Sequence, residues 1–290
     1  MGSFDLVGIK SEQETIGVLN QNIGGRSMKS LILTLLVGTM FLGLPSVGKA
    51  IPGDDSLKLY LPFEEGRGKV AKDKSGNGND GTLEGDTKWI DGKYGQAISL
   101  NGKDSGVTVP DSDSLDTPDE ITVEAWIYPL SVKVDYPEIV LKGYGTAIEM
   151  CVLKDLAIDW EFHIGGWKTV NSGGGAISLK KWFHAAGTYD GKATKVYVNG
   201  TEMGKAGQSG DFGVNNAPVL VGYRLRDMTT PDMFFEGVID DVAIYNRALT
   251  KKEIRTDMEE GVLPLAVQSA GKLTTTWSRI KSKEELGGNK

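Results

Sequence analysis

The chain has 290 residues, a formal net charge of −7 at pH 7, 39 glycines and a single cysteine. An acidic chain without a basic block offers no electrostatic footprint for nucleic acid, which we therefore exclude as a partner. Cys151, being alone, cannot form an intramolecular disulfide or a Cys-based zinc site. The glycines, with six tryptophans and nine tyrosines, favour short strands joined by tight turns, so the composition predicts an all-β protein.

The first fifty residues carry a pattern that is typical of export. Met28-Lys-Ser precedes an apolar run from residue 31 to residue 44, and Gly48 and Ala50 are the small residues of a cleavage site. We expect a signal peptide over residues 28–50 and a secreted, periplasmic or cell-surface protein. The run is shorter than the ~20 residues of a transmembrane helix, so the membrane is a partner only before cleavage. Residues 1–27 are interpreted as a mis-annotated upstream extension.

Beyond residue 50 the apolar residues recur with period two, which is the pattern of half-buried strands. Asn199-Gly200 is a hairpin turn signal between two such strands. One short helix is expected after Thr250, because Thr250 and Glu253 form a capping box. The pattern predicts an all-β domain of half-buried strands.

A series of short motifs, taken in their order and spacing, resembles the laminin G-like jelly-roll family. That family is related in fold to the concanavalin A-like lectins and glucanases. The motifs are LYLPFEEG (59–66), DKSGNGNDG (73–81), YGQA (94–97), ITVEAWI (121–127), WFHAAGTYDG (182–191), VYVNG (196–200) and GVIDDVAIYNRAL (237–249). The resemblance implies a concanavalin A-like jelly roll, an antiparallel β-sandwich over residues 57–262, in a bacterial, secreted binding or adhesion protein. Residues 263–290 fall outside the resemblance and form a polar tail.

The 73–79 loop contains Asp, Ser and Asn at alternating positions with glycines between them, which offers the oxygen ligands that calcium prefers. The spacing also fits much of an EF-hand loop, but glycine-containing segments flank it where an EF-hand has helices, and polar Asp80 stands where a hydrophobe is usual. We therefore reject an EF-hand. The alternative to a calcium site is an ordinary Gly/Asn turn.

Strand alternation from residue 238 to residue 245 predicts that Asp240 shares the core face with Val238, Val242 and Ile244. A buried carboxylate must meet a cation or several hydrogen-bond donors. The family resemblance implies a structural calcium that joins this strand to the 73–79 loop. The predicted ligands are Asp73, Asn77, Asn79 and Asp240, with Glu64 and Asp241 as further candidates.

Exposed aromatic rings are a second kind of candidate site, because sugar-binding modules stack pyranose rings on them. Trp126, Trp160 and Trp182 lie in strand motifs and are expected in the core. The predicted ligand-binding residues are Trp167, which lies between glycine-rich segments, and Tyr136 and Tyr144 on variable segments. Single exposed aromatics are common, so an ordinary surface position is the alternative for each.

Asp159, Glu161 and His163 share the strand face opposite Trp160. Glycosidases use paired carboxylates, but the related glucanases resemble Glu-x-Asp-x-x-Glu, and Ala157 stands at the first carboxylate position here. We therefore expect a solvated polar face and no catalytic residue. His184 is expected to be a structural residue and not a base.

These observations favour an exported, calcium-stabilised, non-catalytic module that binds extracellular polysaccharide or glycoprotein. Two alternatives stay open: a polysaccharide-degrading glycoside hydrolase of the same fold, and a structural envelope protein without a small ligand. Fold alone does not decide among them, because this sandwich hosts all three kinds of protein.

Overall fold

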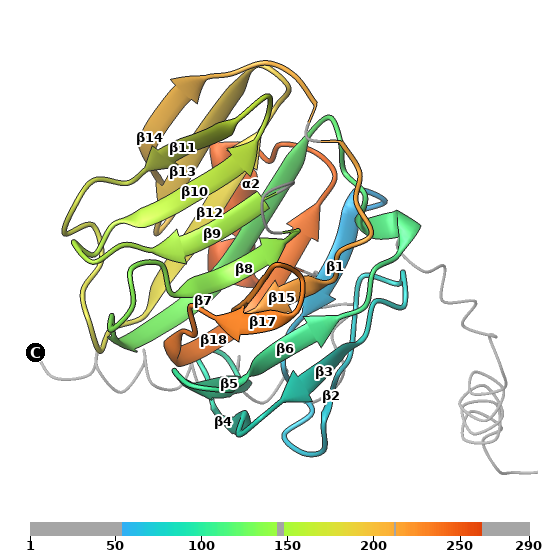
Figure 1. Ribbon diagram of the computed structural model, residues 1–290, viewed down its shortest axis with the longest axis vertical. Helices are drawn as coiled ribbons and strands as arrows, with labels where there is room; N and C mark the ends of the chain where they lie inside the picture. The colour runs from blue at the N-terminus through green and yellow to red at the C-terminus, as the bar shows by residue number, and fades with distance from the viewer. Residues whose placement is uncertain (1–53, 144–147, 212, 263–290) are drawn as a thin grey trace, which may run out of the picture. The chain divides into compact units, whose positions relative to one another are not determined.

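The computed structural model describes residues 54–143, 148–211 and 213–262. The predictions for residues 1–50, for Tyr144 and for the 263–290 tail lie outside the described residues. The described chain forms two large antiparallel sheets and one small hairpin, with sheet B nearest the viewer in Figure 1 and sheet A behind it. This confirms the predicted antiparallel β-sandwich.

Sheet A joins strands from both ends of the described chain. Its hydrogen-bonded order is β14-β13-β12-β7-β18-β5-β4, and β1 also pairs with β18. The strands are β1 (Leu57–Leu61), β4 (Lys88–Asp91), β5 (Gln96–Asn101), β7 (Ile121–Ser131), β12 (Phe183–Tyr189), β13 (Ala193–Val198), β14 (Thr201–Gly207) and β18 (Glu236–Tyr245). Asn199 and Gly200 have φ angles of 49° and 67° between β13 and β14, so the predicted hairpin turn is confirmed.

Sheet B has the order β11-β10-β9-β8-β15-β6-β3-β2. Its strands are β2 (Val70–Ala71), β3 (Gly81–Glu84), β6 (Gly106–Val109), β8 (Glu138–Lys142), β9 (Ile148–Val152), β10 (Ile158–His163), β11 (Trp167–Asn171) and β15 (Val219–Val221). A single turn of 3₁₀ helix, η1 (Asp113–Leu115), follows β6. The hairpin of β16 (Arg224–Arg226) and β17 (Thr230–Asp232) follows β15 and lies in front of sheet B in Figure 1.

The core fills the space between the two sheets and follows the period-two pattern. In β9 and β10 the inward residues are Ile148, Met150, Val152, Ile158, Trp160 and Phe162. Trp160 is 0% exposed in this core, as predicted, whereas Trp126 is 6% exposed on the other face of sheet A, where its ring meets His184. Trp182 is only half-buried and packs against Tyr128, with ring centroids 5.5 Å apart.

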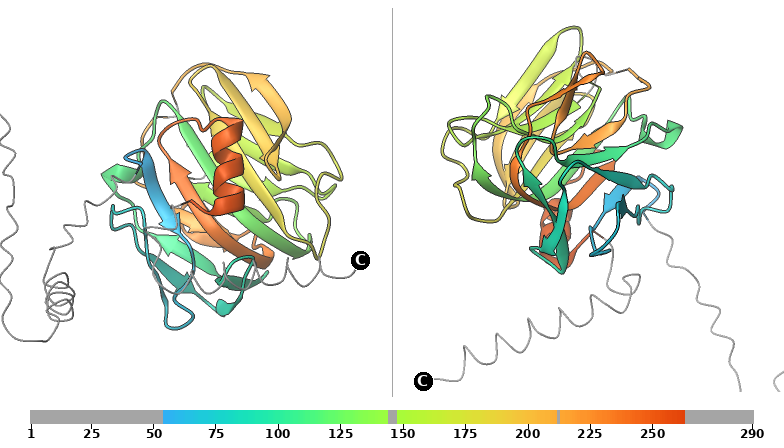
Figure 2. Two further views of the ribbon diagram at one scale, coloured as in Figure 1. Left: turned by 180° about the vertical axis from the view of Figure 1, so that it is seen from behind. Right: turned by 60° about the horizontal axis from the view of Figure 1, so that its bottom comes forward.

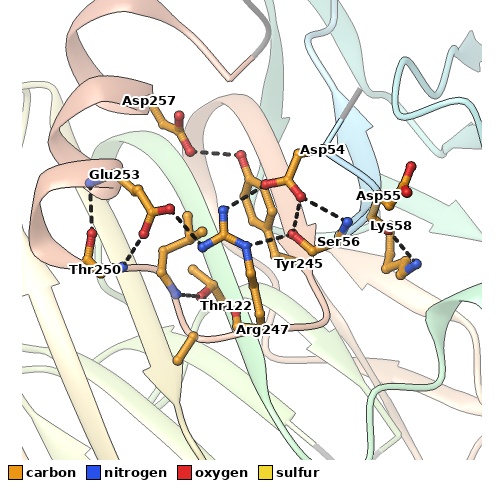
Figure 3. A network of polar contacts seen from close by, with 12 residues as sticks. Asp54, Asp55, Ser56, Lys58, Thr122, Tyr245, Arg247, Thr250, Glu253 and Asp257 are labelled. Atoms are coloured by element: carbon orange, nitrogen blue, oxygen red, sulfur yellow. Dashed lines mark hydrogen bonds and ion pairs between the residues drawn. The ribbon is translucent and has the colours of Figure 1, made fainter. Parts of the chain in front are cut away.

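The helix α2 (Lys251–Glu260) packs on the outer face of sheet A, as the left view of Figure 2 shows. Its capping box is formed as predicted: Thr250 accepts from Glu253 N–H, and the Glu253 carboxylate accepts from Thr250 N–H. Arg247 donates to Asp54 at 2.7 Å, to Ser56 Oγ at 2.8 Å and to Glu253 at 2.9 Å (Figure 3). This guanidinium therefore fastens the start of the described chain to its last helix.

A β-bulge in β18 changes which residues face the core. Ile239, Val242 and Ile244 point into the core, whereas Ala243 belongs to the outer cluster under α2. The register shifts between Asp240 and Ala243, and Asp241 has a φ of 49°. The predicted shared face of Asp240, Val242 and Ile244 is therefore wrong, because an inserted bulge residue reverses the alternation. Asp240 is nevertheless fully buried, at 0% exposure.

Within the described residues, no helix is both long enough and apolar enough to cross a membrane.

Candidate ligand-binding face

The outward face of sheet B carries a cluster of acidic side chains. Because Met150, Trp160 and Phe162 point into the core, Glu149, Asp159 and Glu161 point away from sheet A. Glu149 is paired directly with Glu161 across β9 and β10, and Glu138 of β8 is paired with Cys151, the neighbour of Asp159. Directly paired residues of an antiparallel sheet have Cβ atoms roughly 5 Å apart. We call Glu138, Glu149, Asp159 and Glu161 the carboxyl cluster.

The carboxyl cluster is buried, not solvated. Glu138, Glu149 and Asp159 are 0%, 5% and 4% exposed, and Glu161 is half-buried. Thr169 Oγ1 of β11 donates to Asp159 Oδ1 at 2.5 Å. The predicted solvated polar face is therefore wrong for Asp159, which lies between β9 and β11 and accepts from Thr169, whereas Glu161 keeps partial exposure.

The β16–β17 hairpin also lies on the outward side of sheet B (Figure 1). Arg224 donates through Nε and Nη2 to the two carboxylate oxygens of Asp232, at 2.9 and 3.1 Å, which holds the two strands together. The hairpin rests on an apolar patch of the same face, where Leu141 and Leu220 meet Tyr223. The hairpin brings Arg224 and Asp232 close enough to act electrostatically on the carboxyl cluster.

Burial favours the neutral form of these acids. It raises the pKa of Glu161 to about 8, with the hydrogen bond to Asp159 and its charge adding to the effect. It raises the pKa of Glu149 to about 7, opposed by Arg224 and reinforced by Asp159 and Asp232. It also raises the pKa of Glu138 well above its usual range, and the charge of Glu149 adds to this effect. At neutral pH the cluster therefore holds protons that exposed glutamates would lose.

Two members of the cluster keep unused hydrogen-bonding capacity. Within the described part of the chain, no donor reaches either carboxyl oxygen of Glu138 or Oε1 of Glu149. Buried acceptors are normally paired, and leaving one unpaired costs about 1–3 kcal/mol. Unpaired buried acids beside an exposed surface are typical of functional sites.

An exposed aromatic ring lies on the same face. Trp167, the first residue of β11, is 45% exposed, as predicted. It is paired with His163, and their rings meet edge-on with centroids 5.7 Å apart. Tyr136 is also exposed, at 42%, but precedes β8 and lies at the opposite end of the strands from Trp167. The structure therefore does not bring Trp167 and Tyr136 together as one platform.

The predicted calcium ligands fall into two groups, and the first is the 73–79 loop. Asp73 accepts from the N–H groups of Tyr60, Ser75 and Asn79, at 3.0, 2.8 and 2.9 Å, and from Ser75 Oγ at 2.8 Å. Asn77 and Asn79 each donate to Lys58 O, at 3.2 and 2.8 Å. These hydrogen bonds hold the 73–79 loop against β1.

The second group lies where β18 changes its partner from β5 to β1. Asp240 Oδ2 accepts from the N–H groups of Lys93 and Tyr94, at 3.0 and 3.1 Å, and Oδ1 accepts from Asp241 N–H at 2.9 Å. The Tyr60 hydroxyl donates to Asp241 Oδ1 at 2.7 Å. A buried carboxylate needs either a cation or several hydrogen-bond donors, and Asp240 has several backbone donors.

Glu64 belongs to this second group. It lies against the same β4–β5 turn, where a Cβ on Gly95 would come within 2.3 Å of its Oε2. Gly95 also has a φ of 62°, so the YGQA motif needs its glycine for both reasons.

The Tyr60 hydroxyl lies near three carboxylates, those of Glu64, Asp240 and Asp241. Burial, then the charges of Asp241, Asp240 and Glu64, raise the pKa of Tyr60 well above its ordinary value. Three carboxylates gathered in this way fit a hard cation by charge. Nevertheless, among residues 54–143, 148–211 and 213–262, no three His, Cys, Asp or Glu side chains are placed to hold one metal ion. Calcium would therefore need backbone carbonyls or water as further ligands.

Glu138, Glu149, Arg224 and Asp232 are the site residues that the sequence analysis did not select. Glu149 alternates with the apolar residues Ile148 and Met150, and this pattern alone places it on an outward face. The pattern does not show which residue lies beside Glu149 on the next strand. Its pairing with Glu161 depends on the register between β9 and β10.

Comparison with known families and structures identifies the fold independently. Residues 101–255 match the model of the concanavalin A-like lectin/glucanases superfamily. No curated protein matches the chain.

Solved structures that match this chain include domains of larger proteins. The binding domain of Paraclostridial Mosquitocidal Protein 1 is 20% identical with a TM-score of 0.58, and the match covers 70% of this chain and 51% of that one. Domain 4 of AbnA, a GH43 extracellular arabinanase from Geobacillus stearothermophilus solved with arabinotriose, is 24% identical with a TM-score of 0.55, over 69% and 97%.

A structure of botulinum neurotoxin type C, whose cell entry is described as dependent on two ganglioside molecules, is 16% identical with a TM-score of 0.55, over 74% and 52%. This chain thus spans about half the length of the two toxin structures. At these identities the likeness shows the fold alone.

Proposed function

Because this chain belongs to the concanavalin A-like lectin/glucanases superfamily, we propose that it is an exported, non-catalytic module that binds a glycan or glycoprotein. The observation that carries the proposal is the Trp167 ring, exposed beside the carboxyl cluster on the outward face of sheet B. An exposed indole offers a flat apolar surface for a sugar ring, and the neighbouring polar groups can fix its orientation.

The comparisons support the same class of ligand. One structural neighbour was solved with arabinotriose, and another is described by its interaction with gangliosides. Both are similar in fold to this chain, and both descriptions name a carbohydrate. The site in this chain differs in having its polar groups mostly buried, so its ligand has to be established directly.

Replacing Trp167 by Ala is expected to weaken binding to the recognised glycan by about tenfold to a hundredfold, because stacking on an aromatic ring contributes about 1–3 kcal/mol. Binding of the wild type and the variant to a glycan array, followed by titration of the strongest ligand, measures this. Tyr136→Ala is the matched control, since Tyr136 is equally exposed at the other end of the strands. Equal affinities for wild type and Trp167→Ala would contradict the proposal.

A hydrolysis assay on the bound glycan separates binding from catalysis. Glu149 and Glu161 face each other and hold raised pKa values, which is the arrangement that favours the glycoside hydrolase alternative. Turnover by the wild type that is lost in Glu149→Gln would replace the non-catalytic proposal by that alternative.

We also propose that calcium binds at Glu64, Asp240 and Asp241 and stabilises the fold, since Glu64 and the distant consecutive pair Asp240 and Asp241 all act on Tyr60 there. Bound calcium would neutralise this negative charge. At about one hundred times its dissociation constant it is expected to add roughly 2.7 kcal/mol and to raise the melting temperature by several degrees. Thermal melting with chelator, calcium or magnesium measures the shift.

Glu64→Gln keeps the size of the side chain and should remove most of the calcium response, whereas Asp86→Ala, an exposed control, should retain it. A wild type that is shown to be metal-free and whose melting temperature ignores calcium would end this proposal.

Export follows from the sequence pattern at residues 28–50. N-terminal sequencing of secreted protein tests it, with Ile51 as the expected first residue and a start many residues away as the contrary result.

A further inference from the structure

The outward face of sheet B has more acidic than basic groups. The carboxyl cluster and Asp232 supply five carboxyl groups, while the hairpin contributes the guanidinium groups of Arg224 and Arg226. Both of these arginines already bind the same acid, Asp232. A ligand that meets this face therefore finds carboxyl oxygens in excess, and a positive charge on the ligand would complement them.

The buried members of the cluster point to the same ligand chemistry. Glu138 is 0% exposed and, within the described part of the chain, no donor reaches either of its carboxyl oxygens, nor Oε1 of Glu149. The charge of Glu149 raises the pKa of both Glu138 and Glu161. A positive charge held at the partly exposed Glu161 would act favourably on these buried acceptors, and an anion would not.

The exposed edge of the cluster lies beside the aromatic ring. Glu161 is the partly exposed member, and it is paired with Thr169, two residues along β11 from Trp167. Diagonal neighbours of this kind lie roughly 7 Å apart. One ligand can therefore cover the Trp167 ring and reach Glu161 at the same time.

We propose that this face binds a saccharide that carries a protonated amine, with a sugar ring stacked on Trp167 and the ammonium group donating to Glu161. Glu149, directly across from Glu161, supplies the second acceptor. This inference rests on the proposed function, because it names the class of glycan that the same site takes.

A divalent metal would be another source of positive charge, and we commit to the amine. Among the residues that the structure describes, no three acidic, histidine or cysteine side chains are placed to hold a metal ion. An ammonium group donates three hydrogen bonds without requiring such a fixed shell.

Proton release distinguishes this mode of binding from ordinary sugar binding. Glu161 and Glu149 have pKa values of about 8 and about 7, and their neighbours are Asp159 and His163 on β10, Cys151 on β9, Glu138 on β8 and Arg224 and Asp232 on the hairpin. An ammonium group beside these carboxyls favours their charged form. Amine binding at pH 6.5 should therefore expel protons into the buffer, and binding of a neutral saccharide should not.

The experiment is calorimetric titration of the full chain at pH 6.5 with the tetramer of glucosamine and, separately, the tetramer of N-acetylglucosamine. Two buffers of different ionisation enthalpy give the number of protons released. We expect the glucosamine tetramer to bind at least tenfold more tightly and to release protons. In Glu161→Gln the preference should fall to less than threefold and the release should be lost. Glu259→Gln, on the exposed surface of α2, is the matched control and should behave as the wild type.

Each other outcome decides against the inference in a different way. Equal binding of both tetramers overturns the amine but leaves the proposed glycan module intact. No binding to either tetramer, with an empty glycan array, overturns the proposed function itself. A preference that vanishes with chelator and returns with calcium assigns the positive charge to a metal. Equal binding of a lysine tetramer, unchanged in Trp167→Ala, removes the saccharide from the inference.

Discussion

Raising the pH from 4 to 9 is expected to lower the unfolding free energy of the wild type by about 3 kcal/mol more than that of the Glu149→Gln variant. Burial raises the pKa of Glu149 from 4.5 in the unfolded chain to about 7 in the fold. The folded carboxyl holds its proton more tightly, so this stabilisation is complete below pH 4.5 and is lost as the pH rises through 7. Glu161 acts with the same sign, reduced by its partial exposure to solvent.

Urea unfolding at a series of pH values measures this difference. His184, whose pKa burial lowers to about 3, contributes the opposite slope below pH 6.5, but it does so in both proteins and cancels. Glu259→Gln, which removes a carboxyl from the exposed surface of α2, is the control for loss of one acid elsewhere. If the unfolding free energies of the wild type and Glu149→Gln change with pH in parallel, then Glu149 does not hold its proton more tightly in the fold than in the unfolded chain.

Asp240→Ala is expected to destabilise the fold by about 3–5 kcal/mol, even in the presence of a chelator. The substitution leaves the backbone N–H groups of Lys93, Tyr94 and Asp241 without their common acceptor. It also opens a cavity at the point where β18 changes partners. Denaturant midpoints with an unchanged slope measure the loss.

Asp86→Ala is the control for Asp240→Ala, because the Asp86–Lys88 ion pair is exposed and should be worth less than about 1 kcal/mol. Similar losses in the two variants would mean that the Asp240 carboxylate does not organise the β4–β5 turn. A loss that appears only when calcium is present would instead assign the role of Asp240 to the metal.

Local patterns predicted the fold well, because the elements depend on neighbours in sequence. Alternation placed Trp160 in the core and Asp159 on the other face, and the capping box at Thr250 marked the start of α2. The Asn199-Gly200 turn likewise depends only on the φ angles that these two residues tolerate. Each of these features is decided within a few residues of the chain.

The site depended on contacts that local patterns do not contain. The alternation in β18 failed at the bulge, since the left-handed φ at Asp241 follows from the exchange of β5 for β1 as partner. Asp159 is buried where alternation alone predicted solvent, because pairing of β10 with β11 brings Thr169 to its carboxylate. The pairing of Glu149 with Glu161 depends on the register between two strands, which alternation within one strand does not give.

Hydrogen exchange of the backbone amides, measured with and without the glycan that binds most tightly, tests the location of the site most directly. The outward face of sheet B as binding site predicts protection in β10 and β11, next to Trp167, and in the β16–β17 hairpin, with no change in the 73–79 loop. Protection confined to the 73–79 loop or to the outer face of sheet A, while binding persists, would contradict it.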